Sequence, residues 1–197
     1  MLVTGCLLMY FTTSDLVTGG ALAQDSLVTD QPSVKYTDDK YDFTITVAPA
    51  WKSAPLQGFA VPGVARAAYS GQGGASIVVF VQEPGKDYAP RFLVEESAKG
   101  MEQGLKATVK VKEVRAVAGK QAMWMVVEGK GSGAALDGKS EVPTTQHWVA
   151  VPREKDIVVI LLTCSTADYQ QLAKSFEATL KKLTIGGKQT ATQTASK

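Results

Sequence analysis

The sequence predicts an α+β domain, with a mainly antiparallel sheet of about six to seven strands and helices packed on it. Three observations lead to this prediction. Short segments with strand periodicity recur along the chain, turn residues separate most of them at hairpin length, and two longer segments have helical periodicity. Hairpin-length links join antiparallel neighbours, because a parallel crossover needs roughly a dozen residues or more.

The first three expected strands lie in the first half of the chain. Residues 41–47, YDFTITV, alternate in polarity as in a half-buried strand, with three apolar residues on one face: Phe43, Ile45 and Val47. Residues 64–69 and 75–82 follow as two strands, joined by the turn sequence SGQGG. The continuous apolar run SIVVFV indicates that the third strand is central in the sheet.

A helix is expected over residues 86–106, where apolar residues recur near helical spacing and Pro90 suits the first turn. Gly100 and Gly104 weaken this prediction, since glycine disfavours a helix interior. Strand periodicity then returns in four segments, with a Gly-rich loop at 129–139 between the second and the third; the strands are 108–118, 122–128, 141–151 and 156–164.

The last expected element is a helix with a clear amphipathic pattern. Ser165 or Thr166 can cap it, and Asp168 lies in the first turn, where the helix dipole favours negative charge. An apolar stripe follows at helical spacing, before Lys181 and Lys182 end the helix; its members are Tyr169, Leu172, Ala173, Phe176 and Leu180.

The length and charge of the chain limit its class. Its 197 residues suit one domain with tails, and we expect a polar leader at 24–35, the domain at 36–185 and a disordered tail at 186–197. The net charge is +2, with basic and acidic residues interleaved, so no nucleic-acid partner is expected. No apolar stretch is long enough to span a bilayer as a helix.

The N-terminal segment predicts export. Residues 1–23 end in Ala21-Leu22-Ala23, which fits signal-peptide cleavage after Ala23, although no basic residue precedes the apolar part. The alternative is a mildly apolar N-terminus that is not a signal. A second processing signal, Val3-Thr4-Gly5-Cys6, resembles a lipoprotein cleavage box and would place a lipid anchor on Cys6; too few residues precede it in this sequence.

The stretch GAALDGKS, Gly133–Ser140, fits the phosphate-binding pattern G-x-x-x-x-G-K-[ST]. That motif functions when a helix begins at its Gly-Lys-Ser end and directs its positive end at the phosphate. Here Pro143 and the β-forming residues after it predict a strand instead. Nucleotide binding through this loop is therefore the least favoured function.

Two residues have side chains that could carry chemistry, His147 and Cys164. His147 is the single histidine and could act as a general base, but no triad can be assembled around it, and apolar neighbours would raise the pKa of a Cys164 thiol. One histidine and two unpaired cysteines also offer no zinc-ligand spacing. We therefore expect structural residues here, with no catalytic residue, no cofactor and no metal.

A long loop at 49–63 is rich in apolar residues and lies between prolines and glycines. Such a loop either covers the core or offers a docking surface. We favour core cover, and keep as the alternative a partner surface formed by Trp51, Leu56 and Phe59.

The segment YTDDKYDFTITVAPAWK resembles the opening of PsbP-like domains, at Tyr36, Phe43, Pro49 and Trp51. VAGKQAMWMVVEG resembles a later strand entry of these domains, and ADYQQLAKSFEATLKKLTI their closing helix. The family has an α/β/α sandwich and includes PsbP of photosystem II, a Ran-binding nuclear import factor and bacterial envelope lipoproteins such as DcrB. The resemblance covers roughly 36–185 and implies a non-enzymatic binding or assembly factor, with no shared catalytic residue set.

Together these observations predict a non-catalytic, exported binding or assembly domain of the bacterial cell envelope, periplasmic or envelope-associated, with an unidentified protein partner. The alternative is a small-ligand-binding protein with a pocket between the sheet and the helices. Nucleotide binding through Gly133–Ser140 is the less favoured alternative.

Overall fold

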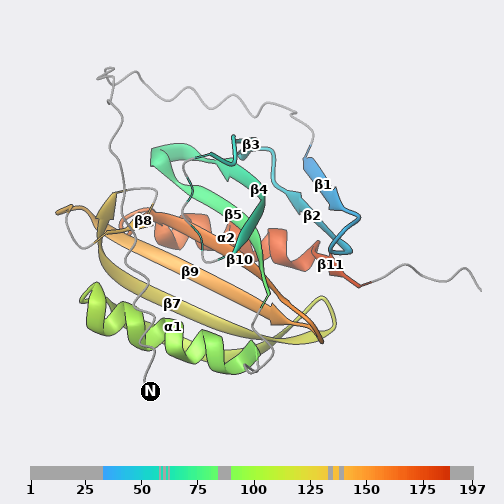
Figure 1. Ribbon diagram of the computed structural model, residues 1–197. Coiled ribbons are helices and arrows are strands. Elements are labelled where there is room, and N and C mark those ends of the chain that lie inside the picture. Colours follow the sequence, from blue (N-terminus) through green and yellow to red (C-terminus); the bar gives the residue numbers. More distant parts are fainter. Residues whose placement is uncertain are drawn as a thin grey trace, which may run out of the picture.

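The computed structural model describes residues 33–57, 59, 61, 63–83, 90–132, 135–137 and 140–186. These residues form two antiparallel sheets and two α-helices (Figure 1). The small sheet has the order β1-β2-β11, with bounds Val34–Asp38, Phe43–Val47 and Thr184–Ile185.

The large sheet has eight strands in the order β3-β4-β5-β10-β9-β7-β6, with β8 paired to β7 beside this path. In that order the bounds are Lys52–Ser53, Val64–Ser70, Ser76–Gln82, Ile157–Ser165, Pro143–Pro152, Lys120–Ser132 and Thr108–Val117, and β8 is Ala135–Leu136. A 3₁₀ turn, Gln72–Gly74, joins β4 to β5. Each pairing in this sheet is antiparallel. Hairpin-length links predict this for β4–β5, β6–β7 and β9–β10.

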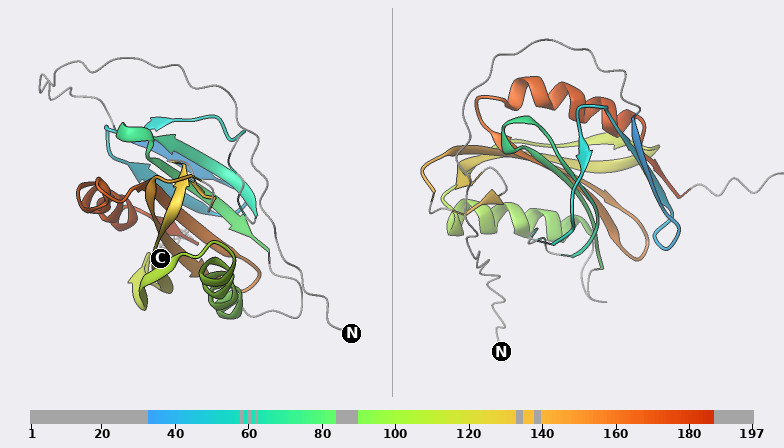
Figure 2. Two further views of the ribbon diagram at one scale, coloured as in Figure 1. Left: turned by 90° about the vertical axis from the view of Figure 1, so that its left-hand side faces the viewer. Right: turned by 90° about the horizontal axis from the view of Figure 1, so that it is seen from above.

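The two helices lie on opposite faces of the large sheet (Figure 2). Helix α1, Pro90–Gly104, covers one face, and helix α2, Tyr169–Lys181, covers the other together with the small sheet. The predicted α+β class and the α/β/α sandwich are therefore confirmed.

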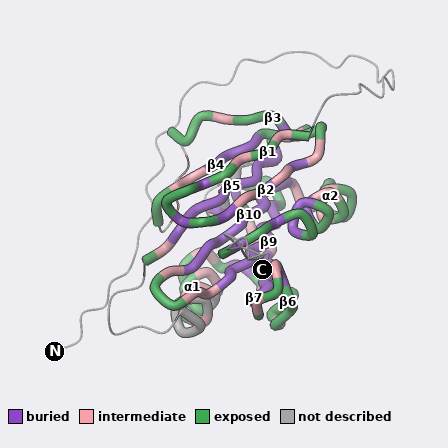
Figure 3. Tube along the Cα trace, turned by 90° about the vertical axis from the view of Figure 1, so that its right-hand side faces the viewer, coloured by how far each residue is buried: buried purple, intermediate pink, exposed green. Residues whose placement is uncertain are grey.

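Strand β10 explains how the core is divided. It pairs with β5 on one side and β9 on the other, so both of its faces are buried (Figure 3). Val158, Ile160 and Leu162 join the cluster beneath α2, and Ile157, Val159 and Leu161 join the cluster beneath α1. A strand buried on both faces has a continuous apolar sequence, which accounts for IVVILL.

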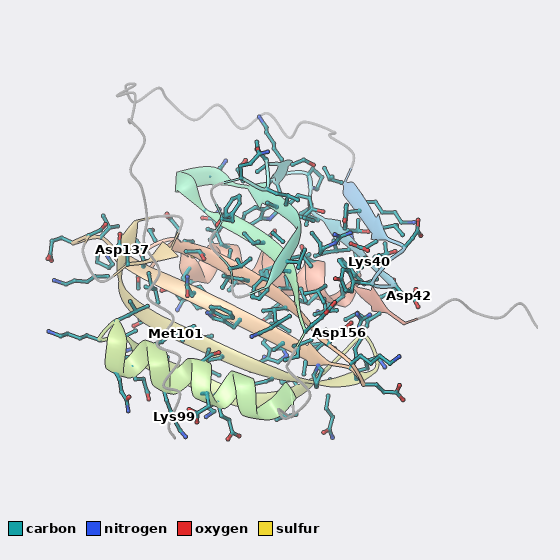
Figure 4. All side chains as sticks on the ribbon, viewed as in Figure 1. Lys40, Asp42, Lys99, Met101, Asp137 and Asp156 are labelled. Atoms are coloured by element: carbon teal, nitrogen blue, oxygen red, sulfur yellow. The ribbon has the colours of Figure 1, made fainter. Side chains whose placement is uncertain are left out.

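Helix α1 lies against the sheet along one side only. Figure 4 shows Met101 on the side that faces the sheet and Lys99 on the opposite side. Met101 and Leu105 pack against the α1-side cluster, and Lys99 pairs with Glu96 in solvent. The predicted helix is confirmed from Pro90 onward, while residues 86–89 lie outside the described residues.

Several boundaries differ from the sequence prediction. Strand β1 begins at Val34, inside the expected polar leader; its alternation is weak because the inward face includes the polar Asp38. The Gly-rich loop at 129–139 is partly strand, since β7 continues to Ser132 and pairs with β8. Asp168 is the N-cap residue of α2, and its N–H donates to Ser165 Oγ at 3.2 Å.

The expected signal segment at 1–23, its cleavage position after Ala23 and Cys6 lie outside the described residues. So do most of the expected leader, 24–32, and the C-terminal residues 187–197. These expectations stay predictions.

A buried carboxylate joins the two sheets at one corner. Asp38 lies in β1, and its side chain accepts hydrogen bonds from Arg66 Nε at 2.5 Å, the Tyr41 N–H at 3.0 Å and the Tyr36 hydroxyl at 3.0 Å. Burial opposes its charged form, but these donors outweigh burial, and the pKa of Asp38 is lowered. The corner is thus held by an ionised, hydrogen-bonded aspartate.

Replacing Asp38 by alanine is expected to lower the free energy of unfolding by about 2 kcal/mol, because Arg66 loses its partner while keeping some solvent contact. Urea unfolding followed by circular dichroism measures this change. The neighbouring exposed Asp39→Ala is the matched control, with an expected change below about 0.5 kcal/mol. Equal changes in the two variants would contradict the role of Asp38.

Candidate binding site beneath helix α2

The single histidine lies in the core beneath α2. Strand alternation places His147 on the same face of β9 as Val149 and Val151, while Trp148 faces α1. His147 is 3% exposed, and its ring centroid lies 5.0 Å from that of Trp124 and 5.0 Å from that of Phe176. Aromatic rings from β7 and α2 therefore enclose the imidazole.

One ring nitrogen of His147 has a partner and the other has none among the described residues. Nδ1 lies 3.1 Å from the Tyr169 hydroxyl, in the first turn of α2. Nε2 is buried without a hydrogen-bond partner. Burial, helped by the positive charge of Arg115, lowers the pKa of His147 to about 4, so the imidazole is neutral at neutral pH.

Trp124 adds a second unpaired group beside the imidazole. Its Nε1–H is buried with no acceptor among the described residues. The other two tryptophans are paired: Trp51 Nε1 donates to Ser175 Oγ at 3.1 Å, and Trp148 Nε1 donates to Gln146 Oε1 at 3.1 Å. Two contacting rings thus each carry an unpaired nitrogen, which is rare for buried polar groups.

A cation lies over one of these two rings. The Arg115 guanidinium on β6 lies over the Trp124 ring, with Cζ 4.6 Å from the ring centroid. Its side chain is half-exposed and forms an ion pair with Glu113. A half-exposed cation therefore lies against the ring whose Nε1 is buried and unpaired among the described residues.

Cys164 also lies beneath α2, fully buried in the same core cluster. Burial and the nearby charge of Asp168 raise the pKa of its thiol to about 12. The thiolate is the reactive form of cysteine, so this side chain is unreactive near neutral pH.

The thiol of Cys164 is expected to resist alkylation in the folded protein. In a Cys6→Ser variant at pH 8, iodoacetamide should add nothing to the native chain and one carbamidomethyl group to the urea-unfolded chain, as intact mass spectrometry would show. Rapid native labelling would contradict the buried position of Cys164.

The GAALDGKS stretch is only partly described; Gly133, Ala134, Gly138 and Lys139 lie outside the described residues. Ser140 donates its N–H to Asp137 Oδ1 at 2.9 Å and its hydroxyl to Asp137 Oδ2 at 2.8 Å. Strand β9 follows from Pro143, where a phosphate-binding motif needs a helix. The Ser140 donors thus bind a carboxylate of the same loop, at the end of the sheet opposite Asp156 (Figure 4).

The apolar loop at 49–63 does not present its three large residues on one surface. Trp51 is 1% exposed beneath α2, where its ring lies so close to Gly71 that a Cβ there would come within 2.6 Å of it. Phe59 packs on the α1 side of the sheet, and only Leu56 is exposed, at 42%. Trp51 is therefore a core residue, which corrects its place in the alternative partner surface.

The described residues also bear on metals and membranes. Among them, no group of three or more His, Cys, Asp or Glu side chains is placed to hold a metal ion. No helix in the described part of the chain is long and apolar enough to cross a membrane.

No protein-family model and no curated protein sequence matches this chain. Solved structures do match its fold. Cyanobacterial PsbP (CyanoP) of Synechocystis sp. PCC 6803 is similar with a TM-score of 0.59 at 13% identity, over 85% of this chain and 100% of that one.

Two further structures have the same architecture. LpqN of Mycobacterium tuberculosis, involved in cell envelope biogenesis, has a TM-score of 0.51 at 14% identity, over 81% of this chain and 88% of its own. The Ran-binding protein Mog1p of Saccharomyces cerevisiae has a TM-score of 0.51 at 12% identity, over 79% and 96%. The chain therefore has the PsbP-like fold, and identities this low establish the fold alone.

Proposed function

We propose that this chain is a non-catalytic binding or assembly domain that is exported and acts in a bacterial cell envelope. One observation carries the non-catalytic part: His147 and Cys164, the two side chains best suited to chemistry, are both buried beneath α2. Burial moves the pKa of each away from neutrality, to about 4 and about 12. Neither side chain is therefore suited to general-base or nucleophilic catalysis near neutral pH.

The envelope part of the proposal has two supports. The first is the A-x-A sequence ending at Ala23, which predicts cleavage of a signal peptide. The second is the fold that the chain shares with LpqN, a protein involved in cell envelope biogenesis.

An activity screen tests the non-catalytic part. The purified chain is incubated with ester, peptide and phosphoester substrates, beside a His147→Gln variant. We expect no turnover above buffer with either protein. A turnover that the His147→Gln substitution abolishes would overturn the proposal, because it would make His147 a catalytic residue.

Photo-crosslinking in cells tests the partner. Leu56 is the exposed residue among the three considered for a partner surface, so a photoreactive amino acid at position 56 should form a discrete adduct with one envelope protein. The same amino acid at Lys99, on the exposed side of α1, is the matched control and should form none. Identical adducts from both positions would contradict a specific surface at Leu56.

Small-ligand binding between the sheet and a helix is the second candidate function. The unpaired nitrogens of Trp124 and His147 beneath α2 favour it, since a buried polar group without a protein partner can bind a polar ligand.

Nucleotide binding through Gly133–Ser140 is less favoured, because Asp137 occupies the Ser140 donors. Calorimetry with ATP and GTP should give no heat of binding, and Lys139→Ala should change nothing. Heat that disappears in Lys139→Ala would contradict this expectation.

A further inference from the structure

We propose that Trp124 and His147 form a binding site beneath helix α2 for a small monocarboxylate, whose oxygen accepts hydrogen bonds from both rings. This inference rests on the second candidate function, small-ligand binding, and names its site and ligand class. It starts from two nitrogens that are unpaired among the described residues, on rings whose centroids lie 5.0 Å apart.

The site offers hydrogen-bond donors. Trp124 Nε1–H can only donate. Among the described residues, the Tyr169 hydroxyl has His147 Nδ1 as its hydrogen-bond partner, and donating its hydrogen to Nδ1 leaves the proton of the neutral imidazole on Nε2. The opposite tautomer would leave the Tyr169 hydrogen unpaired as well. Both unpaired nitrogens are therefore donors, and each needs an acceptor.

The charge beside the site selects an anionic acceptor over water. Arg115 lies over the Trp124 ring, and its charge reaches His147, where it helps keep the imidazole neutral. A carboxylate in the same position gains from this positive charge, whereas an uncharged acceptor gains little. Glu113 now pairs with Arg115, so the ligand would compete with an exposed ion pair of low strength.

The side chains around the site determine which group is attached to the carboxylate of the ligand. Trp124 and Phe176 present aromatic rings, and Leu172 packs at the border of the same cluster. These side chains suit a short apolar or aromatic group attached to the carboxylate. Arg115 is half-exposed, and movement of its side chain would let the ligand reach the Trp124 ring from solvent.

The three tryptophans provide a direct test by nuclear magnetic resonance. In the 15N-labelled full chain, each indole N–H gives one signal, and only Trp124 Nε1 lacks a protein acceptor among the described residues. Sodium phenylacetate is titrated at constant ionic strength, with phenylacetamide as the uncharged control. We expect the Trp124 signal to shift saturably with phenylacetate, while the Trp51 and Trp148 signals stay in place.

Two variants complete the test. Trp124→Phe assigns the signal, and Arg115→Gln, at a half-exposed position, keeps all three indoles and should weaken phenylacetate binding about tenfold. If Trp124→Phe does not fold, the indole N–H signals are instead assigned directly in the parent chain and in Arg115→Gln. A Trp124 signal that stays unchanged, equal shifts of all three signals or an equal response to phenylacetamide would overturn the proposal. These outcomes leave the non-catalytic proposal intact, since a His147-dependent turnover tests that one.

Discussion

Replacing Trp51 by alanine is expected to lower the free energy of unfolding by about 4 kcal/mol, the loss typical of a large aromatic side chain removed from a core. Trp51 is 1% exposed and packs beneath α2, where its Nε1–H also donates to Ser175. Closure of the resulting cavity would need movement of β4 and α2 together. Urea unfolding followed by far-ultraviolet circular dichroism measures the change.

Leu56 provides the matched control in the same loop. It is 42% exposed, so Leu56→Ala should change the free energy of unfolding by less than about 0.5 kcal/mol. A comparable loss in both variants would show that the whole loop is structural. A small loss for Trp51→Ala would contradict its position in the core.

Acid is expected to destabilise the folded chain through His147 by about 3 kcal/mol between neutral pH and pH 4. The pKa of His147 is about 4 when folded and about 6.5 when unfolded, so the unfolded chain binds the proton first as the pH falls. The stabilising contribution is therefore complete above about pH 6.5 and is lost progressively toward pH 4.

Urea unfolding at a series of pH values measures this slope, and a His147→Gln variant isolates it. Glutamine does not titrate, so the variant should lose about 3 kcal/mol less than the parent chain between pH 7 and pH 4. Carboxylates such as Asp38, whose pKa is lowered, respond in both proteins and cancel in the difference. Parallel curves for the two proteins would contradict the burial of a neutral imidazole.

The elements that the sequence predicts well are those with a strong period. SIVVFV and IVVILL are continuous apolar runs because β5 and β10 are covered on both faces. The stripe that includes Phe176 and Leu180 predicts α2 and its buried side. In each case one local sequence pattern is enough to predict the element.

The elements that the sequence does not reveal lack such a pattern. The inward face of strand β1 includes the polar Asp38, and the strand is stabilised by its pairing with β2, a tertiary contact. Strands β3, β8 and β11 have two residues each, too few for any periodicity. Trp51 lies in a loop, and the sequence alone leaves open which face of that loop is buried.

The candidate site depends on strand order, which no local pattern gives. Trp124 and His147 come from β7 and β9, and their rings meet because Val126 pairs with His147 in the register of these strands. Residues two apart in a strand lie on the same face, so Trp124 shares a face with Ala122, and His147 shares one with Val149. This alternation could have placed Trp124 and His147 on the α2 face once β7 and β9 were known to be neighbours. The positions of Arg115 and Tyr169 needed the structure.

We propose that this PsbP-like domain is exported and binds rather than catalyses. The most direct measurement is the intact mass of the chain recovered from the envelope and cytosolic fractions of its native cells. We expect an envelope form that begins at Gln24, cleaved after Ala23 and with Cys164 as its single cysteine. A chain with lipid on Cys6 would still be exported, but it would not be cleaved after Ala23. A cytosolic chain that retains residues 1–23 would contradict the proposed export.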